Sequence, residues 1–403
     1  MAEEAKKHIL IDARIIGTGT GVYTEGILNE LQKLDTVNRY TVVVDPGVNW
    51  EPQAENFTAY QSKNTYRKDM FFIRGNINLA GELYGMHADV FWGSFQYIPF
   101  FYFKKNTLLT IHDLTQVRIK NPKLRAEKRE EWKKDKKAVI KDKIRKLPFS
   151  IIPRGILMWG LDIFSFKFSV RRAKHIFTPS NYVKKDAMEY FKLPEEKVSV
   201  TVNGGVVVDH TDKPEAVEQL KGKDFLLYVG TDHGHKNLNI LVEVMDLLRG
   251  NKKDLHPNLH LVFAGRKDRN YSTIQERAKE LGLEDRVHVL GFVSSGEKVW
   301  LYKNAKLYVF PSLSEGFGIP PLEAMAYGLP IVASDRTAIP EVCGDAAVYF
   351  NPEDKQDIAE KILSTIDNEK LKKELVKNGA HRNEMFKWED AAEVVLREIK
   401  KLN

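Results

Sequence analysis

The chain has 403 residues, of which 43% are hydrophobic and 29% are charged, and its formal net charge is +7. This length allows two domains of ordinary size, and the composition is typical of a soluble globular protein. A single cysteine, Cys343, excludes an intrachain disulfide and a cysteine-rich zinc site. The first residues lead into a strand pattern without an apolar signal core, so we expect a cytoplasmic protein.

Short apolar runs alternate with helical patterns through the first half of the chain. Such alternation predicts an α/β fold with a parallel sheet that is covered on both faces. Ligands of such sheets lie at the carboxyl ends of the strands. The predicted strands of this half are residues 8–13, 40–45, 88–93, 107–111, 174–180 and 198–202.

Two groups of residues follow strands of this sheet. Gly17, Gly19 and Gly21 come after the first strand and before a helical pattern, but the third glycine position of a dinucleotide fingerprint is occupied by Val22 or Thr24. A nicotinamide or flavin dinucleotide is therefore not predicted. His112 and Asp113 follow the strand at 107–111, and a lone histidine at such a place is more often a satisfied polar residue than a catalyst.

The positive charge of the chain is concentrated in one segment. Residues 118–146 contain fourteen Lys or Arg and five Asp or Glu, a net charge of +9, and an aromatic apolar stretch at 149–168 follows. Charges, Pro153 and Gly155 interrupt that stretch, which makes it a poor transmembrane helix. Together, Arg118 to Phe168 predict a segment that lies at an anionic membrane surface. A solvated helix that leads into the core is the alternative, and nucleic-acid binding is not predicted because no fold for it is recognised.

The second half repeats the pattern of a parallel sheet after a polar hinge at 203–224. A polar loop, Gly230 to Asn237, follows the first of its strands, and Lys236 and Asn237 are predicted to open a helix. From residue 354 onward the pattern is helical. The predicted strands are residues 225–229, 259–264, 287–290, 307–310 and 331–333.

Residues 311–334 contain the most informative stretch, PSLSEGFGIPPLEAMAYGLPIVAS. A glycine-containing loop follows the strand at 307–310, and Pro320 and Pro321 open a short helix that Gly328 ends. Free backbone N–H groups and the positive end of a helix dipole then meet at one place. The pattern predicts an anion site suited to a diphosphate.

Two carboxylates frame this predicted anion site. Glu315 lies in the loop and Glu323 in the first helical turn, with seven residues between them. A carboxylate repels a phosphate, so both are better suited to accept hydrogen bonds from neutral hydroxyls of the same ligand. A diphosphate with hydroxyls at both ends is a nucleotide-sugar. The alternative is that Glu323 only stabilises its helix N-terminus and that Glu315 is solvated.

With its flanks, this stretch resembles the donor-binding signature of the retaining glycosyltransferases of family 4, the glycosyl transferases group 1, which have the GT-B fold. The resemblance implies two Rossmann-like domains that face each other across a deep cleft. The N-terminal acceptor domain would span residues 1–207, with the basic and aromatic insertion at about 118–168. The donor domain would span 208–385, and a C-terminal helix at 386–403 would cross back to the first domain.

The resemblance also implies roles for individual residues. His112, Glu315 and Lys236 are assigned to catalysis: His112 would contact the donor sugar, and Lys236 would stabilise the leaving diphosphate. His235 stands where the family often has an arginine. Donor-binding positions are Gly230, His235, Phe292, Val293, Gly316, Phe317, Gly318, Ile319 and Glu323. The acceptor and diphosphate loop positions are Gly19, Gly21 and Asp113.

The function that follows is transfer of a sugar from a nucleotide-diphosphate donor, with a weak preference for GDP-mannose by family likeness. The acceptor would be a lipid-linked or membrane-associated glycan in surface polysaccharide or glycolipid assembly, which places the protein at the inner face of a membrane. No cofactor and no metal are expected, because Lys236 and the helix near Pro320 can replace a cation. The alternatives are a sugar phosphorylase or nucleotide-sugar epimerase on the same fold, and a non-catalytic nucleotide-sugar-binding protein.

Overall fold

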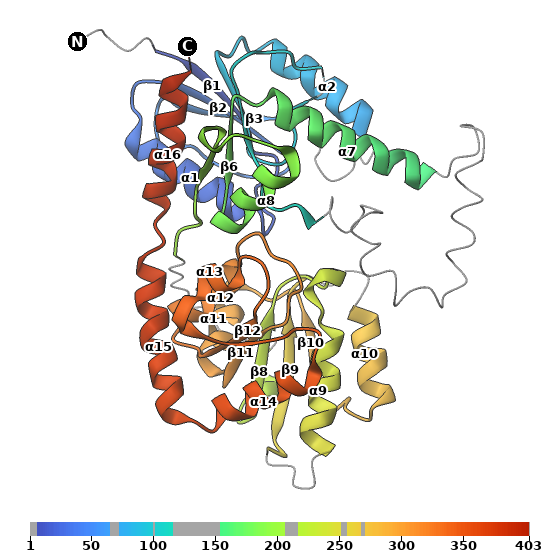
Figure 1. Cartoon of the computed structure of the whole chain (residues 1–403). Coiled ribbons are helices and arrows are strands. Elements are labelled where there is room, and N and C mark those ends of the chain that lie inside the picture. The colour runs from blue at the N-terminus through green and yellow to red at the C-terminus, as the bar shows by residue number, and fades with distance from the viewer. Residues whose placement is uncertain are drawn as a thin grey trace. The chain divides into compact units, whose positions relative to one another are not determined.

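A computed structural model describes residues 6–64, 72–99, 101–115, 154–205, 217–250, 256–266 and 271–402. The chain forms two compact units (Figure 1). The first comprises Met1–Val202 with Trp388–Asn403, and the second comprises Asn203–Lys387. The basic segment at 118–146, which is predicted to lie at a membrane surface, falls outside the described residues, as does the aromatic stretch up to residue 153.

The first unit contains a seven-stranded parallel sheet of strand order β3-β2-β1-β4-β5-β6-β7. Its strand order reverses at β1 and β4, as in doubly wound α/β folds. The strands are β1 His8–Asp12, β2 Arg39–Val44, β3 Phe57–Gln61, β4 Val90–Gly93, β5 Thr107–Thr110, β6 His175–Thr178 and β7 Val198–Val200.

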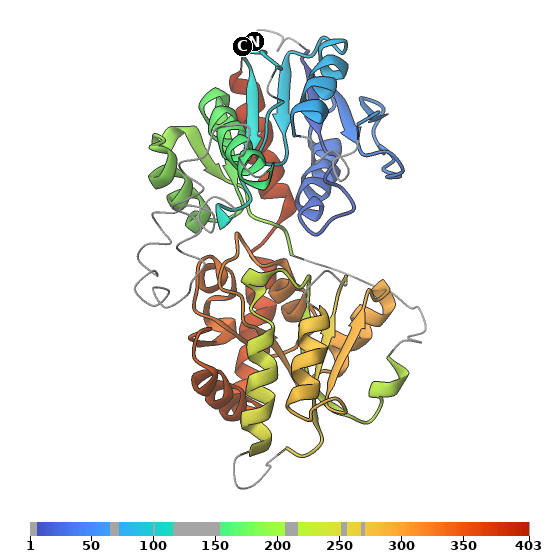
Figure 2. The same ribbon diagram turned by 90° about the vertical axis from the view of Figure 1, so that its right-hand side faces the viewer.

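Helices cover both faces of this sheet (Figure 2). Successive strand residues point to opposite faces, so Ile9 and Ile11 of β1 pack into one core and Leu10 into the other. The first core contains α1 (Gly21–Leu34) and α16 (Trp388–Lys401). The second contains α2 (Phe72–Tyr84), α7 (Arg154–Arg172) and α8 (Asn181–Phe191), and the turn η2 (Glu195–Lys197) follows α8.

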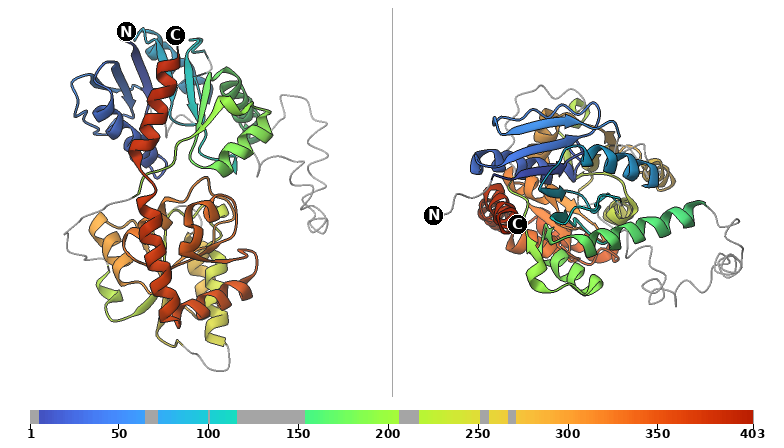
Figure 3. Two further views of the ribbon diagram at one scale, coloured as in Figure 1. Left: turned by 60° about the vertical axis from the view of Figure 1, so that its left-hand side comes forward. Right: turned by 90° about the horizontal axis from the view of Figure 1, so that it is seen from above.

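The second unit contains a six-stranded parallel sheet of order β10-β9-β8-β11-β12-β13 (Figure 3). The strands are β8 Asp224–Val229, β9 Leu259–Ala264, β10 Val287–Gly291, β11 Leu307–Phe310, β12 Ile331–Ser334 and β13 Ala347–Phe350. The helices are α9 Asn239–Gly250, α10 Tyr271–Glu280, α11 Ser295–Asn304, α12 Ile319–Ala326, α13 Ile339–Cys343, α14 Lys355–Ile366 and α15 Glu369–Glu384. Short 3-10 turns are η3 Glu218–Leu220, η4 Gly234–Lys236 and η5 Gly344–Ala346.

The two parallel sheets confirm the predicted α/β class. The sequence prediction needs correction at three places. The sequence did not predict β3 and β13, which are edge strands with several half-buried or exposed side chains. Lys236 and Asn237 do not open a helix: Lys236 ends η4, and Asn237 has a left-handed backbone with φ of 59°.

No described helix is both long enough and apolar enough to cross a membrane.

Candidate functional site

The carboxyl edge of the second sheet brings two predicted loops together. Strands β8 and β11 are parallel neighbours, so the loops that follow them leave the sheet side by side. The backbone N–H of Leu313 donates to the carbonyl of His235 over 2.8 Å. The side-chain amide of Asn237 donates to the carbonyl of Pro352 over 2.7 Å, which fixes the turn that carries Lys236. The predicted donor residues of both loops therefore lie at one place.

Lys236 and Glu315 form an ion pair across these two loops. The Lys236 Nζ lies 2.6 Å from Glu315 Oε1, and the side chains are only 17% and 10% exposed. The same ammonium lies 5.9 Å from the centre of the Phe310 ring. The backbone N–H of Glu315 donates to the hydroxyl of Thr337 over 2.9 Å, which fixes the loop. The carboxylate and the ammonium are thus held together by contacts within the protein.

Glu323 is held by a second helix. Its Oε1 accepts from Lys298 Nζ over 2.7 Å, and its Oε2 accepts from the Tyr302 hydroxyl over 2.8 Å. Burial, and then the nearby carboxylate, raise the pKa of Tyr302 well above its usual value, so this hydroxyl stays protonated and donates. Glu323 is the fifth residue of α12, which corrects its predicted place in the first turn. The interpretation that it only stabilises the helix N-terminus is therefore wrong.

Lys298 and Tyr302 are absent from the sequence prediction. Both lie on α11, four residues apart, so their side chains share one face of that helix. The spacing was visible in the sequence, but the packing of α11 beside α12 was not. Sequence reasoning therefore identified the carboxylate and missed the two groups that orient it.

The loop before α12 has the geometry expected of a helix N-terminus that faces a ligand. Gly318 has a φ of +117° and directly precedes Ile319, the first helical residue, and Pro320 and Pro321 follow in the first turn. Phe317 is buried, and its ring meets Phe386 edge-on at 5.5 Å between centroids. The glycines around Phe317 leave backbone without side chains beside the helix dipole, which suits an anion.

Three glycines line the adjacent part of the same edge. The N–H of Gly230 donates to the carbonyl of Ala264 over 2.9 Å, and that of Gly265 donates to the carbonyl of Gly291 over 2.8 Å. A Cβ added to Gly265, where φ is +148°, would lie 1.9 Å from the carbonyl oxygen of Gly230. The strand ends thus approach each other as bare backbone. Phe292, the next residue, is 79% exposed, and Val293 beside it is half-buried.

His112 lies in the first unit, just beyond β5. It is 8% exposed, and its Nε2 lies 2.9 Å from the carbonyl oxygen of Ser94. Its ring contacts Tyr23 edge-on at 4.9 Å and stacks with Phe95 at 5.8 Å. Burial lowers the pKa of His112 to about 4, so the ring is neutral at pH 7. Since Nε2 donates to the carbonyl, Nδ1 carries the lone pair and can accept a hydrogen bond.

Two of the other predicted residues of the first unit, Asp113 and Gly21, have local structural roles. The carboxylate of Asp113 accepts from the Thr115 N–H over 2.8 Å, and its carbonyl accepts from the Gln96 amide over 3.0 Å. Gly21 begins α1, and a Cβ there would lie 2.2 Å from the carbonyl oxygen of Ile15. Gly19 has open space around the position of a Cβ. Packing thus explains Gly21 but not Gly19.

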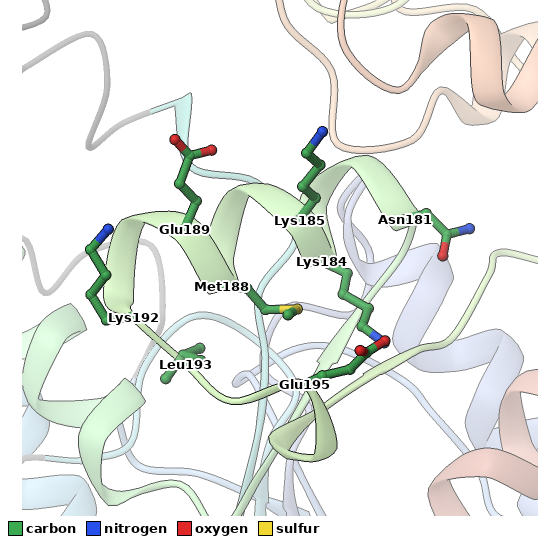
Figure 4. A pocket seen from close by; sticks show the side chains of 8 residues that line it. All are labelled: Asn181, Lys184, Lys185, Met188, Glu189, Lys192, Leu193 and Glu195. Atoms are coloured by element: carbon green, nitrogen blue, oxygen red, sulfur yellow. The ribbon is translucent and has the colours of Figure 1, made fainter.

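A surface hollow of about 780 Å³ lies elsewhere in the first unit, along α8 and its connection to η2 (Figure 4). Lys184 and Glu195, two of its lining residues, form an ion pair at 3.2 Å. Three lysines and two glutamates line the hollow, so its charge is nearly balanced and favours no ligand class, and none of the predicted site residues lines it. Within the described ranges, no three His, Cys, Asp or Glu side chains gather as metal ligands.

Comparison with known protein families and sequences gives matches to part of the chain. The model of the glycosyl transferases group 1 family matches residues 209–382. The O-antigen chain mannosyltransferase RfbU of Salmonella typhimurium is 34% identical over 194 residues, which are 48% of this chain and 51% of the relative. The O-antigen chain mannosyltransferase B of Escherichia coli is 29% identical over 229 residues, 55% of this chain and 59% of the relative. The chain thus spans little more than half the length of these two curated relatives.

Solved structures match almost the whole chain. Sucrose-phosphate synthase from Thermosynechococcus elongatus superposes with a TM-score of 0.71 at 18% identity, covering 99% of each chain. WaaG, a glycosyltransferase involved in lipopolysaccharide biosynthesis, superposes with a TM-score of 0.68 at 16% identity, covering 98% of this chain and 100% of that one. With the two parallel sheets, these likenesses confirm the predicted GT-B fold.

Proposed function

We propose that the chain is a retaining glycosyltransferase of the glycosyl transferases group 1 family, whose model matches residues 209–382. The reaction moves a sugar from a nucleoside-diphosphate donor to a hydroxyl of an acceptor. One observation carries the proposal: Lys236, Glu315 and Glu323 each have a fixed position at the carboxyl edge of the second sheet, around the N-terminus of α12.

The diphosphate of the donor is assigned to Lys236 and the start of α12. The ammonium and the helix dipole both stabilise the negative charge that develops on the leaving diphosphate. The bare backbone around Gly318 allows phosphate oxygens to approach. Gly230 and His235 border the same edge on the β8 side and complete the proposed phosphate site.

The hydroxyls of the donor are assigned to the two carboxylates. Glu315 accepts from the sugar and Glu323 from the ribose, as carboxylate oxygens accept from neutral hydroxyls. Each carboxylate already has a lysine partner, so neither presents an unbalanced negative charge to the diphosphate. The base is assigned to the backbone of Phe292 and Val293, which follow β10.

The proposed chemistry takes place on one face of the sugar. The bond between the anomeric carbon and the phosphate oxygen breaks, and a bond from that carbon to the acceptor oxygen forms on the same face. The proton of the acceptor hydroxyl passes to the leaving phosphate. Neutral His112 contacts the donor sugar near this carbon. An uncharged ring there does not repel the positive charge that develops on the sugar in the transition state. Gly19, Gly21 and Asp113 are assigned to the loops that bind the acceptor and the diphosphate.

The names of the relatives favour a mannose donor and a surface-polysaccharide acceptor. RfbU and its Escherichia coli counterpart are both named as O-antigen chain mannosyltransferases. We therefore propose GDP-mannose as donor and a lipid-linked glycan as acceptor, with the protein at the inner face of the membrane. The basic and aromatic segment from Arg118 to Phe168 is the proposed contact with anionic lipid.

A donor screen tests this proposal. The purified chain is heated with GDP-, UDP-, dTDP- and ADP-sugars, since a ligand at ~100 times its dissociation constant adds about 2.7 kcal/mol of stability. We expect GDP-mannose to raise the melting temperature and slow release of GDP to follow. Sugar phosphate formed from free phosphate would identify a phosphorylase, and binding without any turnover would identify a non-catalytic binding protein. No shift with any donor would overturn the proposal.

A further inference from the structure

Exposed aromatic side chains gather on one part of the first unit. Phe101, Phe103 and Phe164 are 42%, 61% and 54% exposed, although they come from two segments about sixty residues apart. Single exposed apolar residues are common on protein surfaces, whereas a cluster marks a surface that binds something. Tyr84 at the end of α2 is 38% exposed, and its hydroxyl accepts from the backbone N–H of Phe103, so it belongs to the same cluster.

Arg172 joins the two segments into one surface. Its guanidinium lies over the Phe103 ring at 5.2 Å and over the Phe168 ring at 5.3 Å. Phe168 stacks with Phe164 at 6.3 Å, and Phe103 meets Phe101 edge-on at 6.4 Å. These five residues, Phe101, Phe103, Phe164, Phe168 and Arg172, are called the aromatic surface below.

Three of the five residues of this surface lie on the outer face of helix α7. Phe164, Phe168 and Arg172 are spaced by four residues and therefore follow one another along one side of the helix. Phe166 and Val170 lie on the opposite side, where both are buried in the core with α2 and α8. The outer row spans about 12 Å of helix axis at 1.5 Å a residue. The core packing of α7 is thus carried by its inner side, and the exposed Phe164 ring lies on the opposite side.

The two stretches of chain that carry the aromatic surface contain only positive charges. Residues 101–106 and 163–174 contain six Lys or Arg and no Asp or Glu. They are Lys104, Lys105, Lys167, Arg171, Arg172 and Lys174. A partner of complementary chemistry must be negatively charged and must also accept aromatic rings.

We propose that the aromatic surface is seated in the headgroup region of an anionic lipid bilayer. Aromatic rings are favoured at the depth between headgroups and acyl chains, and each Lys or Arg near an anionic leaflet adds electrostatic attraction. The surface consists of described residues outside the basic segment 118–146. It extends the membrane contact of the proposed function to residues that the sequence did not indicate, Phe101 and Phe103 above all.

Flotation with lipid vesicles tests the proposal. The full chain is mixed with vesicles of phosphatidylglycerol and phosphatidylethanolamine, or of phosphatidylcholine alone. The variant Phe101→Ser/Phe103→Ser/Phe164→Ser removes the exposed rings and keeps every charge. The control variant Val37→Ser/Met385→Ser removes exposed apolar side chains elsewhere, since those residues are 51% and 54% exposed. We expect the wild type and the control to bind anionic vesicles alone, and the triple variant to bind at least tenfold more weakly.

A second measurement tests whether the side chain at position 103 enters the lipid headgroup region. In the variant Phe103→Trp, the emission of the added indole, taken as the difference from the wild type with its six tryptophans, should shift to the blue with anionic vesicles and be quenched by lipids that are brominated near the headgroup. Unchanged binding by the triple variant, or emission that vesicles do not alter, would overturn the proposal. So would a triple variant that is a monomer where the wild type is a dimer, because a second copy would then cover the surface. Donor-induced stabilisation is measured in parallel, so a failed donor site and a failed membrane contact are distinguishable.

Discussion

Removing Lys236 should destabilise the second unit as well as block turnover. The ammonium and Glu315 are 2.6 Å apart and largely buried. Two charges at 4 Å attract by about 4 kcal/mol at an effective dielectric constant near 20, and loss of one partner of a buried pair commonly costs about 3–5 kcal/mol. Because the site keeps some contact with solvent, we expect Lys236→Met to lower the free energy of unfolding by about 2–3 kcal/mol.

Removing the charge of Glu315 instead should cost less stability than removing Lys236. In Glu315→Gln the lysine loses its partner, but its flexible stem lets the ammonium reach water. We expect a loss of about 1 kcal/mol for this variant, and we expect the double variant Lys236→Met/Glu315→Gln to be more stable than Lys236→Met alone. The coupling between the two positions should be about 2 kcal/mol.

Calorimetry of the four proteins measures this cycle, because it follows each unfolding transition separately when the units unfold apart. For a unit of this size, 1 kcal/mol corresponds to about 2–4 °C, so Lys236→Met should melt roughly 4–12 °C lower. Turnover with the donor should fall by ~10²-fold or more in both single variants. The reasoning is refuted if Lys236→Met melts like the wild type, or if the two losses simply add in the double variant.

Three further predictions concern single residues of the two units. Gly21→Ala should cost more than about 2 kcal/mol, since its Cβ would meet the Ile15 carbonyl, whereas Gly19→Ala should melt normally and change only kinetics. Tyr302→Phe should weaken nucleotide binding, measured by titration calorimetry, by about tenfold, because Glu323 loses a donor that orients it. The pKa of His112 is about 4 folded and about 6.5 unfolded, so about 3 kcal/mol of stability present at pH 7 should be lost as the pH falls from 6.5 to 4, and His112→Gln should flatten that slope in melting curves.

Most of the fold was predictable because the buried strands have continuous apolar sequences. Strands such as Leu259–Ala264 and Leu307–Phe310 are buried by helices on both faces, and their predicted bounds are those observed. The edge strand Phe57–Gln61 has a partner on one side only and carries polar side chains, so its pattern does not stand out. The sequence predicts a strand well where burial constrains every residue.

The site was predictable where its residues are neighbours in sequence. The loop with Glu315 and the start of α12 at Ile319 form one short motif, and the motif indicated both. Lys298 lies on a different helix, and its approach to Glu323 depends on how α11 packs beside α12. The low pKa of His112 likewise depends on burial under Tyr23 and Phe95, which no local pattern predicts.

The lysine partners resolve a conflict in the predicted chemistry. A diphosphate site flanked by two carboxylates would repel its ligand if those carboxylates stood alone. Glu315 and Glu323 instead each hold an ammonium at 2.6–2.7 Å, so each pair is neutral overall and still offers oxygen acceptors to sugar hydroxyls. Lys236 has a further consequence. Because Glu315 fixes it in place, the ammonium needs little reorganisation to meet the negative charge of the leaving diphosphate, which is the condition under which such a group lowers a reaction barrier most.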